Sequence, residues 1–470
     1  MGTISNAFSI VSQTLDADQS ALNIVANNVA NANTVGYTRE VPNWQENQPI
    51  QINGVSYGTG VTETGATSVR DSVLEERLNQ QQQLASASSS RLASLNTVQA
   101  LFTPDTGSAS SSAGDIGSDL TSFFSSFSSL EAEPTNNAYR QSVLSSASTL
   151  ASDVSNTAAS LNSQRSALDQ EASGVTNQVN ALTTSLAQLN QQIQTTSPDA
   201  DAGTLEDQRQ QDLSQLSQLV GYNQITTGNN GLAITTTSGQ TLVSDGSSYP
   251  LTSGMVDGVT HFFVGTTDVT SQLTSGGGEL GGYLTARDVD IPNVVSSLDQ
   301  LAYSVSTQVN TLNNAGTDLK GDSGNAGNIF SQPTQVAGSA ATMSVVMTDP
   351  NLIAAAGAEQ GTGDNSNATS MANLANQQIV NGQTPTDYYS NLVTTLGSTV
   401  SQVTTENTAQ NASVTQLQTQ NDALSSVNLN DEASAMTTLE RSYQAASQVF
   451  TMLDTVMNSV LNLGTSTAVS

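Results

Sequence analysis

The sequence has no cysteine, one histidine and only ten basic residues, of which Lys320 is the single lysine. Without cysteine, disulfides and thiolate metal sites are excluded, and His261 alone cannot form an ordinary zinc site. Forty acidic residues bring the formal net charge to -30, which repels phosphate backbones and anionic membranes. We therefore expect neither nucleic-acid binding nor membrane insertion.

Long apolar runs are also missing. No run approaches the roughly 18 residues needed to cross a bilayer, and the amino terminus lacks the basic and apolar segments of a cleaved secretory signal. Apolar residues make up only 36% of the 470 residues, and uncharged polar residues fill the deficit. Such a composition suits the wet faces of long helices, and the length allows roughly three domains.

What the sequence does contain is a pair of matching apolar patterns at its two ends. The N-terminal pattern is Ile4, Phe8, Val11, Leu15, Asp18, Leu22, Val25, Val29 and Ala32, and the C-terminal pattern is Met436, Leu439, Tyr443, Ala446, Phe450, Leu453, Met457 and Val460. Alternating steps of three and four are typical of a coiled coil, although a stripe facing an internal core would show the same spacing. Because the patterns are long, we predict that the two ends pair as a coiled coil, here called the terminal seam.

Between these ends the patterns predict long helices around a β region. Helices are expected over residues 67–102, 147–193, 205–219, 292–312 and 384–424, with hairpins over residues 221–287 and a turn at Asn229-Asn230. Thr204 and Asp207 are expected to form a capping box. Extended or looped chain is expected at residues 41–65, a flexible stretch at 104–117 and a helix break at 427–430. The predicted fold class is mainly α with a small β portion: paired terminal coiled-coil helices, a long helical bundle domain and a central antiparallel β region. The predicted domains are a terminal core with its connecting loop (1–65 and 428–470), a long-helix domain (66–220 and 288–427), a β-rich outer portion (221–287) and a variable, loop-rich segment (316–367).

Two strings resemble parts of catalytic or metal sites. Gly321-Asp322-Ser323-Gly324 resembles the nucleophile loop of chymotrypsin-like proteases and could be combined with His261. That enzyme class needs two β-barrels, whereas this chain is mostly helical. The acidic loops at residues 199–203 and 318–322 lack the spacing and closing glutamate of an EF-hand. We expect turns at these positions, and no catalytic residue, metal or cofactor.

The string from Ala26 to Arg39, which reads ANNVANANTVGYTR, follows the N-terminal pattern. Its asparagines are poor helix interior, and Gly36 is placed to supply a positive φ beyond the helix end. Local physics alone predicts a helix that frays into a turn. The string also resembles the amino-terminal signature of bacterial flagellar rod, hook and hook-associated proteins, and its Gly36-Tyr37 pair is closer to the hook-associated members than to the hook protein.

Other segments resemble the same family in the same order along the chain. They are residues 118–140 with Phe123 and Phe124, residues 205–220, Gly281-Gly282-Tyr283-Leu284 with Arg287-Asp288, Val427-Asn428-Leu429, Tyr443-Gln444-Ala445-Ala446 and Leu461-Asn462-Leu463. Two departures are a reduced segment between residues 330 and 363 and Asn430 in place of the family's usual aspartate. Loss of one acidic charge at a helix start has a mild effect.

The resemblance implies a non-enzymatic flagellar subunit between hook and filament, exported without a cleaved signal to the extracellular flagellum. It implies as partners the hook protein, hook-associated protein 3, further copies in a ring of the axial lattice, and an export chaperone on the C-terminal helix. Another axial subunit, such as a hook or distal rod protein, is the alternative, and a secreted serine hydrolase is a remote one. The predicted assembly interface comprises Phe8, Val11, Leu15, Leu22, Val25, Asn28, Val29, Asn31, Gly36, Tyr37, Arg39, Met436, Leu439, Tyr443, Phe450, Leu453, Met457 and Val460.

Overall fold

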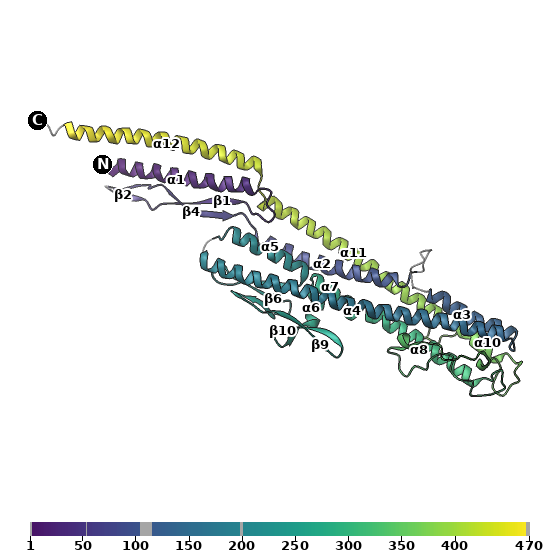
Figure 1. Ribbon diagram of the computed structural model, residues 1–470. Helices are drawn as coiled ribbons and strands as arrows, with labels where there is room; N and C mark the ends of the chain where they lie inside the picture. The colour runs from purple at the N-terminus through teal and green to yellow at the C-terminus, as the bar shows by residue number, and fades with distance from the viewer. Residues whose placement is uncertain (1, 53, 104–114, 198–200, 467–470) are drawn as a thin grey trace. The chain divides into compact units, whose positions relative to one another are not determined.

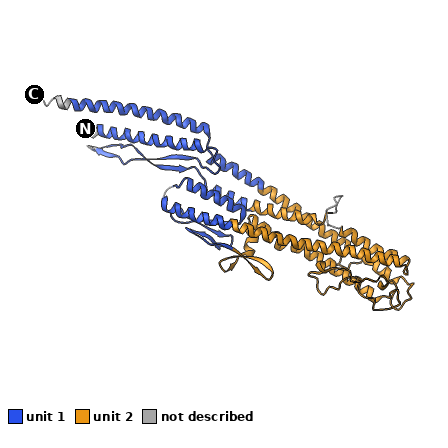
Figure 2. Cartoon of the chain, in the orientation of Figure 1, with its two compact units in different colours: residues 1–83, 179–251, 411–470 blue, residues 84–178, 252–410 orange. Residues whose placement is uncertain are grey.

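The computed structural model describes residues 2–52, 54–103, 115–197 and 201–466. The fold is mainly α with a smaller antiparallel β portion, as predicted. The chain forms two compact units, residues 1–83, 179–251 and 411–470 in unit 1 and residues 84–178 and 252–410 in unit 2 (Figure 2). Because the chain passes between units several times, each unit combines segments that are far apart in sequence.

The terminal part of unit 1 is built on helix α1 (Gly2–Asn31), which packs lengthwise against α12 (Leu429–Ser466) (Figure 1). A second side of α1 contacts the antiparallel pair β1 (Glu40–Glu46) and β4 (Val61–Ser68). In the chain segment that connects β1 to β4, β2 (Ile50–Ile52) and β3 (Val55–Tyr57) form a smaller hairpin. Residues 41–65, predicted to be extended or looped, are thus mostly paired strands.

The rest of unit 1 joins the last part of α4 (Asn137–Thr196) to α5 (Thr204–Leu219) and a four-stranded sheet. Its strands follow the chain in the order β5 (Tyr222–Thr226), β6 (Leu232–Thr236), β7 (Thr241–Ser244) and β8 (Ser247–Ser248). The predicted turn at Asn229 and Asn230 is confirmed, since both have a positive φ, which asparagine tolerates better than most residues. The core side chains of this part come from both the helices and the sheet.

Unit 2 has one apolar core formed by long helices. It joins parts of α2 (Ser72–Ala100), α4 and α11 (Pro385–Ser425) to α3 (Ile116–Ala132) and α8 (Ile291–Ala315). The ring of Phe123 lies about 5 Å from each of the rings of Phe124, Phe127 and Phe330. These rings are almost fully buried. The apolar faces of these helices are therefore covered by other segments of the same chain.

The β region ends earlier than predicted. Strands β9 (Leu251–Val256), β10 (Val259–Val264) and β11 (Thr267–Asp268) form a three-stranded sheet. The next residues are helical, in α6 (Thr270–Gly276), α7 (Gly278–Thr285) and the π-helix η1 (Ala286–Asp290). The extension of the β region to Arg287 was wrong because the glycines near 277 separate two short helices instead of forming a hairpin turn.

Helix boundaries deviate from the predictions at three places. Helix α2 begins at Ser72, not at residue 67, because residues 61–68 pair in β4 and Asp71 accepts from the amides of Val73 and Leu74. Helix α4 begins ten residues before Ala147. The capping box predicted for Thr204 and Asp207 is wrong, since the N-cap residue is Gly203, which has no side-chain bond.

The start of α11 is confirmed, because the hydroxyl of Thr384 accepts from the amide of Asp387 at 3.1 Å. The break predicted at residues 427–430 is also confirmed, with α11 ending at Ser425 and α12 beginning at Leu429. Most of the flexible stretch predicted at residues 104–117, and two residues of the acidic loop at 199–203, lie outside the described residues.

Residues 316–367 are mostly irregular, with the short helices α9 (Ser339–Thr342) and η2 (Pro350–Leu352). Helix α10 (Ser366–Asn373) and the turn η3 (Leu374–Asn376) follow. In the acidic loop, Asp318 accepts from the amides of Lys320 and Asp322, which makes a turn as predicted. In the part of the chain that the structure describes, no helix is long and apolar enough to cross a membrane.

Candidate assembly site

The terminal seam is formed by α1 and α12 running antiparallel to each other. Phe8 near the start of α1 stacks on Phe450 of α12, with ring centroids 4.3 Å apart. At the other end of α1, Asn28 contacts Glu432 at the start of α12. The predicted pairing of the two chain ends is therefore present within a single chain.

The seam is only partly covered within the chain. Of the predicted positions, Val25 is buried, and Val29, Tyr443 and Val460 are exposed. The remaining apolar seam positions are half-buried: Phe8, Val11, Leu15, Leu22, Met436, Leu439, Phe450, Leu453 and Met457. One helix partner thus leaves much of the apolar surface of both helices in contact with water.

Asn28 is the polar centre of the site. Its side chain is fully buried, and its Nδ2 donates to the backbone oxygen of Glu40 (2.8 Å) and to Oε2 of Glu432 (3.1 Å). Its Oδ1 accepts from the hydroxyl of Tyr37 (2.8 Å) and from the amide of Glu40 (3.0 Å). All four bonding positions of the amide are used, so this residue fixes the turn after α1 to both β1 and α12.

Glu432 connects the turn to the C-terminal helix. Its carboxylate is almost completely buried and accepts from Nε of Arg39 at 2.7 Å, in addition to the bond from Asn28. The amide of Arg39 donates to the backbone oxygen of Ser425 (2.9 Å). Because a buried carboxylate is costly without partners, this arrangement strongly favours one geometry between the two ends of the chain.

A second group of charges connects the same turn to α5. The amide of Thr38 donates to Oδ2 of Asp207 (3.1 Å), and Arg70 donates to Oδ1 of Asp207 (2.5 Å). Glu75 and Glu206 also lie within 4 Å of the Arg70 guanidinium. Asp207 therefore anchors the segment after α1 instead of capping its own helix.

Burial and the acidic side chains gathered at this site raise the pKa values of two of its residues. Burial, followed by the neighbouring charges of Glu40, Asp207 and Glu432, raises the pKa of Tyr37 to about 12. Burial raises the pKa of Glu40, with further contributions from Asp201 and Asp207. At neutral pH Tyr37 thus keeps its proton and can donate it to Asn28.

The loop between α1 and β1 contains two further predicted residues. Gly36 has φ +82°, which confirms the predicted positive φ. Asn31 donates to the backbone oxygen of Asn27 (3.1 Å), and its Oδ1 accepts from the hydroxyl of Thr34 (3.2 Å). A pocket of about 270 Å³ lies between this loop and the first turns of α5. The helix thus ends in a defined polar turn, and the fraying prediction from local physics was wrong.

Sequence reasoning predicted Asn28, Tyr37 and Arg39 but missed Glu432, which binds Asn28 and Arg39, and Asp207, which accepts from the amide of Thr38. A signal was present for Glu432, because this acid lies only four residues before Met436, the first position of the C-terminal seam pattern. No local signal distinguishes Asp207 from an ordinary acid in the first helical turn. Whether these residues also contact other subunits stays a prediction.

Two other places contain side chains of types that are used in catalysis. His261 lies in strand β10, and its Nδ1 is 2.6 Å from Oδ2 of Asp268, whereas the hydroxyl of Ser323 accepts from the amide of Glu359. Within the described ranges, no three His, Asp or Glu side chains are grouped to hold a metal ion. These residues therefore have structural partners of their own.

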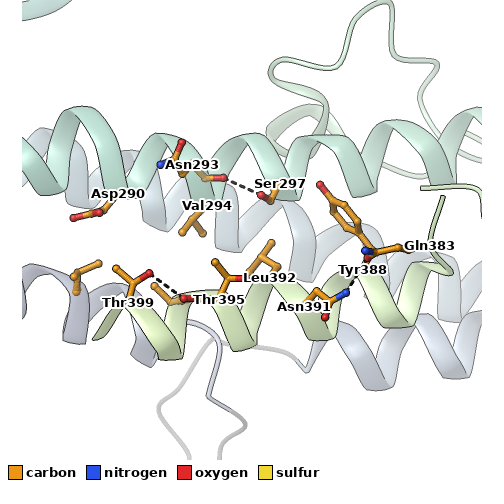
Figure 3. A pocket seen from close by; sticks show the side chains of 12 residues that line it. Asp290, Asn293, Val294, Ser297, Gln383, Tyr388, Asn391, Leu392, Thr395 and Thr399 are labelled. Atoms are coloured by element: carbon orange, nitrogen blue, oxygen red, sulfur yellow. Dashed lines mark hydrogen bonds between the residues drawn. The ribbon is translucent and has the colours of Figure 1, made fainter. Parts of the chain in front are cut away.

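The pocket drawn in Figure 3 has a volume of about 270 Å³ and lies between α8 and α11 in unit 2. Val294 and Leu392 form part of its apolar surface, and several polar side chains around it are bonded within the chain. Ser297 donates to the backbone oxygen of Asn293 (3.0 Å), and Asn391 donates to Oε1 of Gln383 (3.0 Å). The pocket presents no group of convergent charges that would select a ligand.

The paired ends and the long helices agree with what comparison with known proteins shows. The sequence model of the family described as flagellar hook-associated protein FlgK helical domain matches residues 105–330. The sequence model of the flagella basal body rod protein family matches residues 11–38. Flagellar hook-associated protein 1 of Escherichia coli is 24% identical, over 96% of this chain and 98% of that protein. The Bacillus subtilis protein of the same name is 26% identical, over 95% and 96%.

A solved structure has the same fold. The flagellar hook junction protein FlgK from Burkholderia pseudomallei aligns with a TM-score of 0.65 at 18% identity, covering 73% of this chain and 99% of that one. Fold, paired termini and matched models together define a structural subunit of the bacterial flagellum. More closely, the chain is similar along nearly its whole length to flagellar hook-associated protein 1.

Proposed function

We propose that this chain is the structural subunit that joins the hook to the filament of the bacterial flagellum through packing of its terminal helices. The observation that carries the proposal is the buried Asn28–Glu432 contact, which joins positions 404 residues apart and fixes the two chain ends as a single packing surface. The half-buried terminal seam beside it is the apolar surface that neighbouring subunits would cover. The relatives named above are hook-associated proteins, which supports this position in the flagellum.

The proposal includes partners and a route. The partners are the hook protein on one side, hook-associated protein 3 on the other and further copies of this chain in a ring. An export chaperone would hold the C-terminal helix before assembly, because Met452 and Val456 on that helix are exposed apolar residues. The chain would leave the cell without a cleaved signal and act outside it, as a subunit without enzymatic activity.

Gene deletion tests the proposal and separates it from the alternative of a hook or distal rod protein. We expect cells that build hooks but shed flagellin into the medium, because the acceptor for the filament is missing. Loss of the hooks themselves would assign the chain to the hook or rod instead.

A point variant tests the role of the seam. Leu453→Asp places a charge among half-buried apolar side chains and should prevent incorporation, while unit 2 remains folded by circular dichroism. Thr455→Asp, on an exposed position of the same helix, is the matched control and should assemble. Normal filaments from the Leu453→Asp strain would contradict the assigned role of the seam.

A further inference from the structure

Among the described residues of unit 1, two exposed apolar surfaces lie near the terminal seam. The first, here called the α12 flank, consists of Val449, Met452 and Val456, whose spacing of three and four places them on one face of the helix. Each of these residues comes one position before a seam residue, namely Phe450, Leu453 or Met457. The flank therefore lies about 100° around the helix from the seam. Met452 is 59% exposed, and α1 therefore does not cover this face.

The second surface, here called the hairpin face, lies on β2 and β3. Ile50 and Tyr57 are directly opposite each other in the ladder, and Val55 is two residues from Tyr57, so all three side chains share one face. All three are exposed, Val55 by 54%. A two-stranded hairpin is marginally stable alone, and an apolar face open to water makes a further partner favourable.

The two surfaces lie at the same level along α1 but on different sides of it. Nδ2 of Asn6 donates to the backbone oxygen of Gly58, just after the hairpin, and Phe8 packs against the seam residue Phe450, which follows Val449 of the α12 flank. Asn6 and Phe8 are two residues apart, which corresponds to about 3 Å along the helix and about 200° around it. A second copy placed alongside at equal height would therefore bring its hairpin face toward the α12 flank of the first.

Charge favours the same pairing. No Asp, Glu, Lys, Arg or His occurs between Glu46 and Glu63, and Asp454 is the only such residue of α12 after Arg441. Asp454 is two residues from both Met452 and Val456, so it points away from the flank. In a chain with a net charge of -30, these are surfaces where copies can meet without like-charge repulsion.

We propose that the hairpin face of one copy packs on the α12 flank of the next copy, and that this contact builds the ring or helical turn of the junction. The two surfaces differ, so the contact is heterologous and repeats around an axis instead of closing a dimer. The inference rests on the proposed function, because it names the neighbour that the flagellar subunit contacts.

Cross-linking in assembled flagella tests this contact, because the chain contains no other cysteine. Cells co-expressing Tyr57→Cys chains and Met452→Cys chains should yield, after oxidation of isolated flagella, a product of about twice the 48.5 kDa chain mass on non-reducing gels. Neither variant alone should give this product. Tyr57→Cys with Thr438→Cys, which is exposed on the same face of α12 but four turns away, is the matched control and should not cross-link.

Three outcomes would overturn the contact: no product in flagella that contain both variants, a product from Tyr57→Cys alone, or capture of a different flagellar protein by Met452→Cys. If either variant is not incorporated, the pair Val55→Cys and Val456→Cys decides in the same way. Absence of even the wild-type chain from isolated flagella would instead refute the proposed function, so the two failures are distinguishable.

Discussion

The terminal seam of unit 1 and the long-helix core of unit 2 use the same three-four spacing but bury it to different extents. In α4, Leu161 is fully buried in the core of unit 2. In α12, Leu453 is only half-buried, and neighbouring Met452 is exposed. The difference indicates that the core of unit 2 is complete within one chain, whereas the terminal seam needs further partners to bury its apolar surface.

Replacing one leucine in each region by alanine should give the largest difference in stability between the two regions. Leu161→Ala leaves a cavity in a closed core and should lower the free energy of unfolding of unit 2 by about 4 kcal/mol. Leu453→Ala removes a half-exposed side chain and should cost about 1 kcal/mol in the free chain. Thermal unfolding followed by circular dichroism measures both, and equal losses would contradict the distinction between complete and incomplete packing.

A substitution at Asn28 tests how far its buried hydrogen bonds stabilise the pairing of α1 with α12, whose apolar seam is only partly covered. Asn28→Leu should cost about 3 kcal/mol locally, since it leaves the Glu432 carboxylate and the Glu40 amide with fewer partners in a buried place. In assembled flagella, hydrogen exchange at the start of α12 should become faster, with no change in α4. Asn31→Leu at the edge of the same turn is the control and should have a much smaller effect.

The stability of unit 2 should depend on pH through one carboxyl group. Burial and the neighbouring carboxylates of Asp153 and Asp115 raise the pKa of Asp119, in unit 2, to about 7. A raised carboxyl pKa means that the folded state binds the proton more tightly, so this stabilisation is present at low pH and is lost between about pH 4 and pH 7.

Asp119→Asn should therefore make the melting temperature of unit 2 less dependent on pH over this range and higher than wild type at pH 8. The difference between the two proteins should shrink toward pH 4, where the wild-type carboxyl is protonated. An unchanged pH profile in the variant would show that Asp119 is not the group responsible.

Glycine substitutions should give the smallest effects, with opposite signs in the two regions. Gly36→Ala forces a side chain into the left-handed region and should destabilise the turn after α1 by about 1 kcal/mol. Gly174→Ala, in the middle of α4 with open space around it, should stabilise that helix by roughly the same amount. Melting temperatures that move in the same direction would contradict this assignment of backbone conformations.

Sequence periodicity predicted the elements that have strong regular patterns. Residues 147–193 of α4 and the pairing of α1 with α12 follow directly from the three-four spacing of apolar residues. The hairpins between residues 41 and 68 were missed because β1 and β4 are mostly exposed and so lack a clear alternation of apolar and polar residues. Helices α6 and α7 were mistaken for hairpins because seven and eight residues are too few to show a helical period.

The candidate site was half predictable. Asn28, Tyr37 and Arg39 were identified from the family resemblance, and Gly36 from the requirement for a positive φ. Glu432, which binds Asn28, is 404 residues away, and Asp207, which binds the amide of Thr38, is 169 residues away, so both contacts depend on the folded chain. Spacing within a sequence cannot specify which distant acid reaches a given amide.

The incomplete burial of the terminal seam is tested most directly by hydrogen exchange on the free chain and on the same chain in assembled flagella. We expect α1 and α12 to exchange rapidly in the free chain and to become protected on assembly, while α4 is protected in both. Strong protection of α1 and α12 in the free chain, equal to that in flagella, would contradict the claim that the terminal seam is completed only by neighbouring subunits.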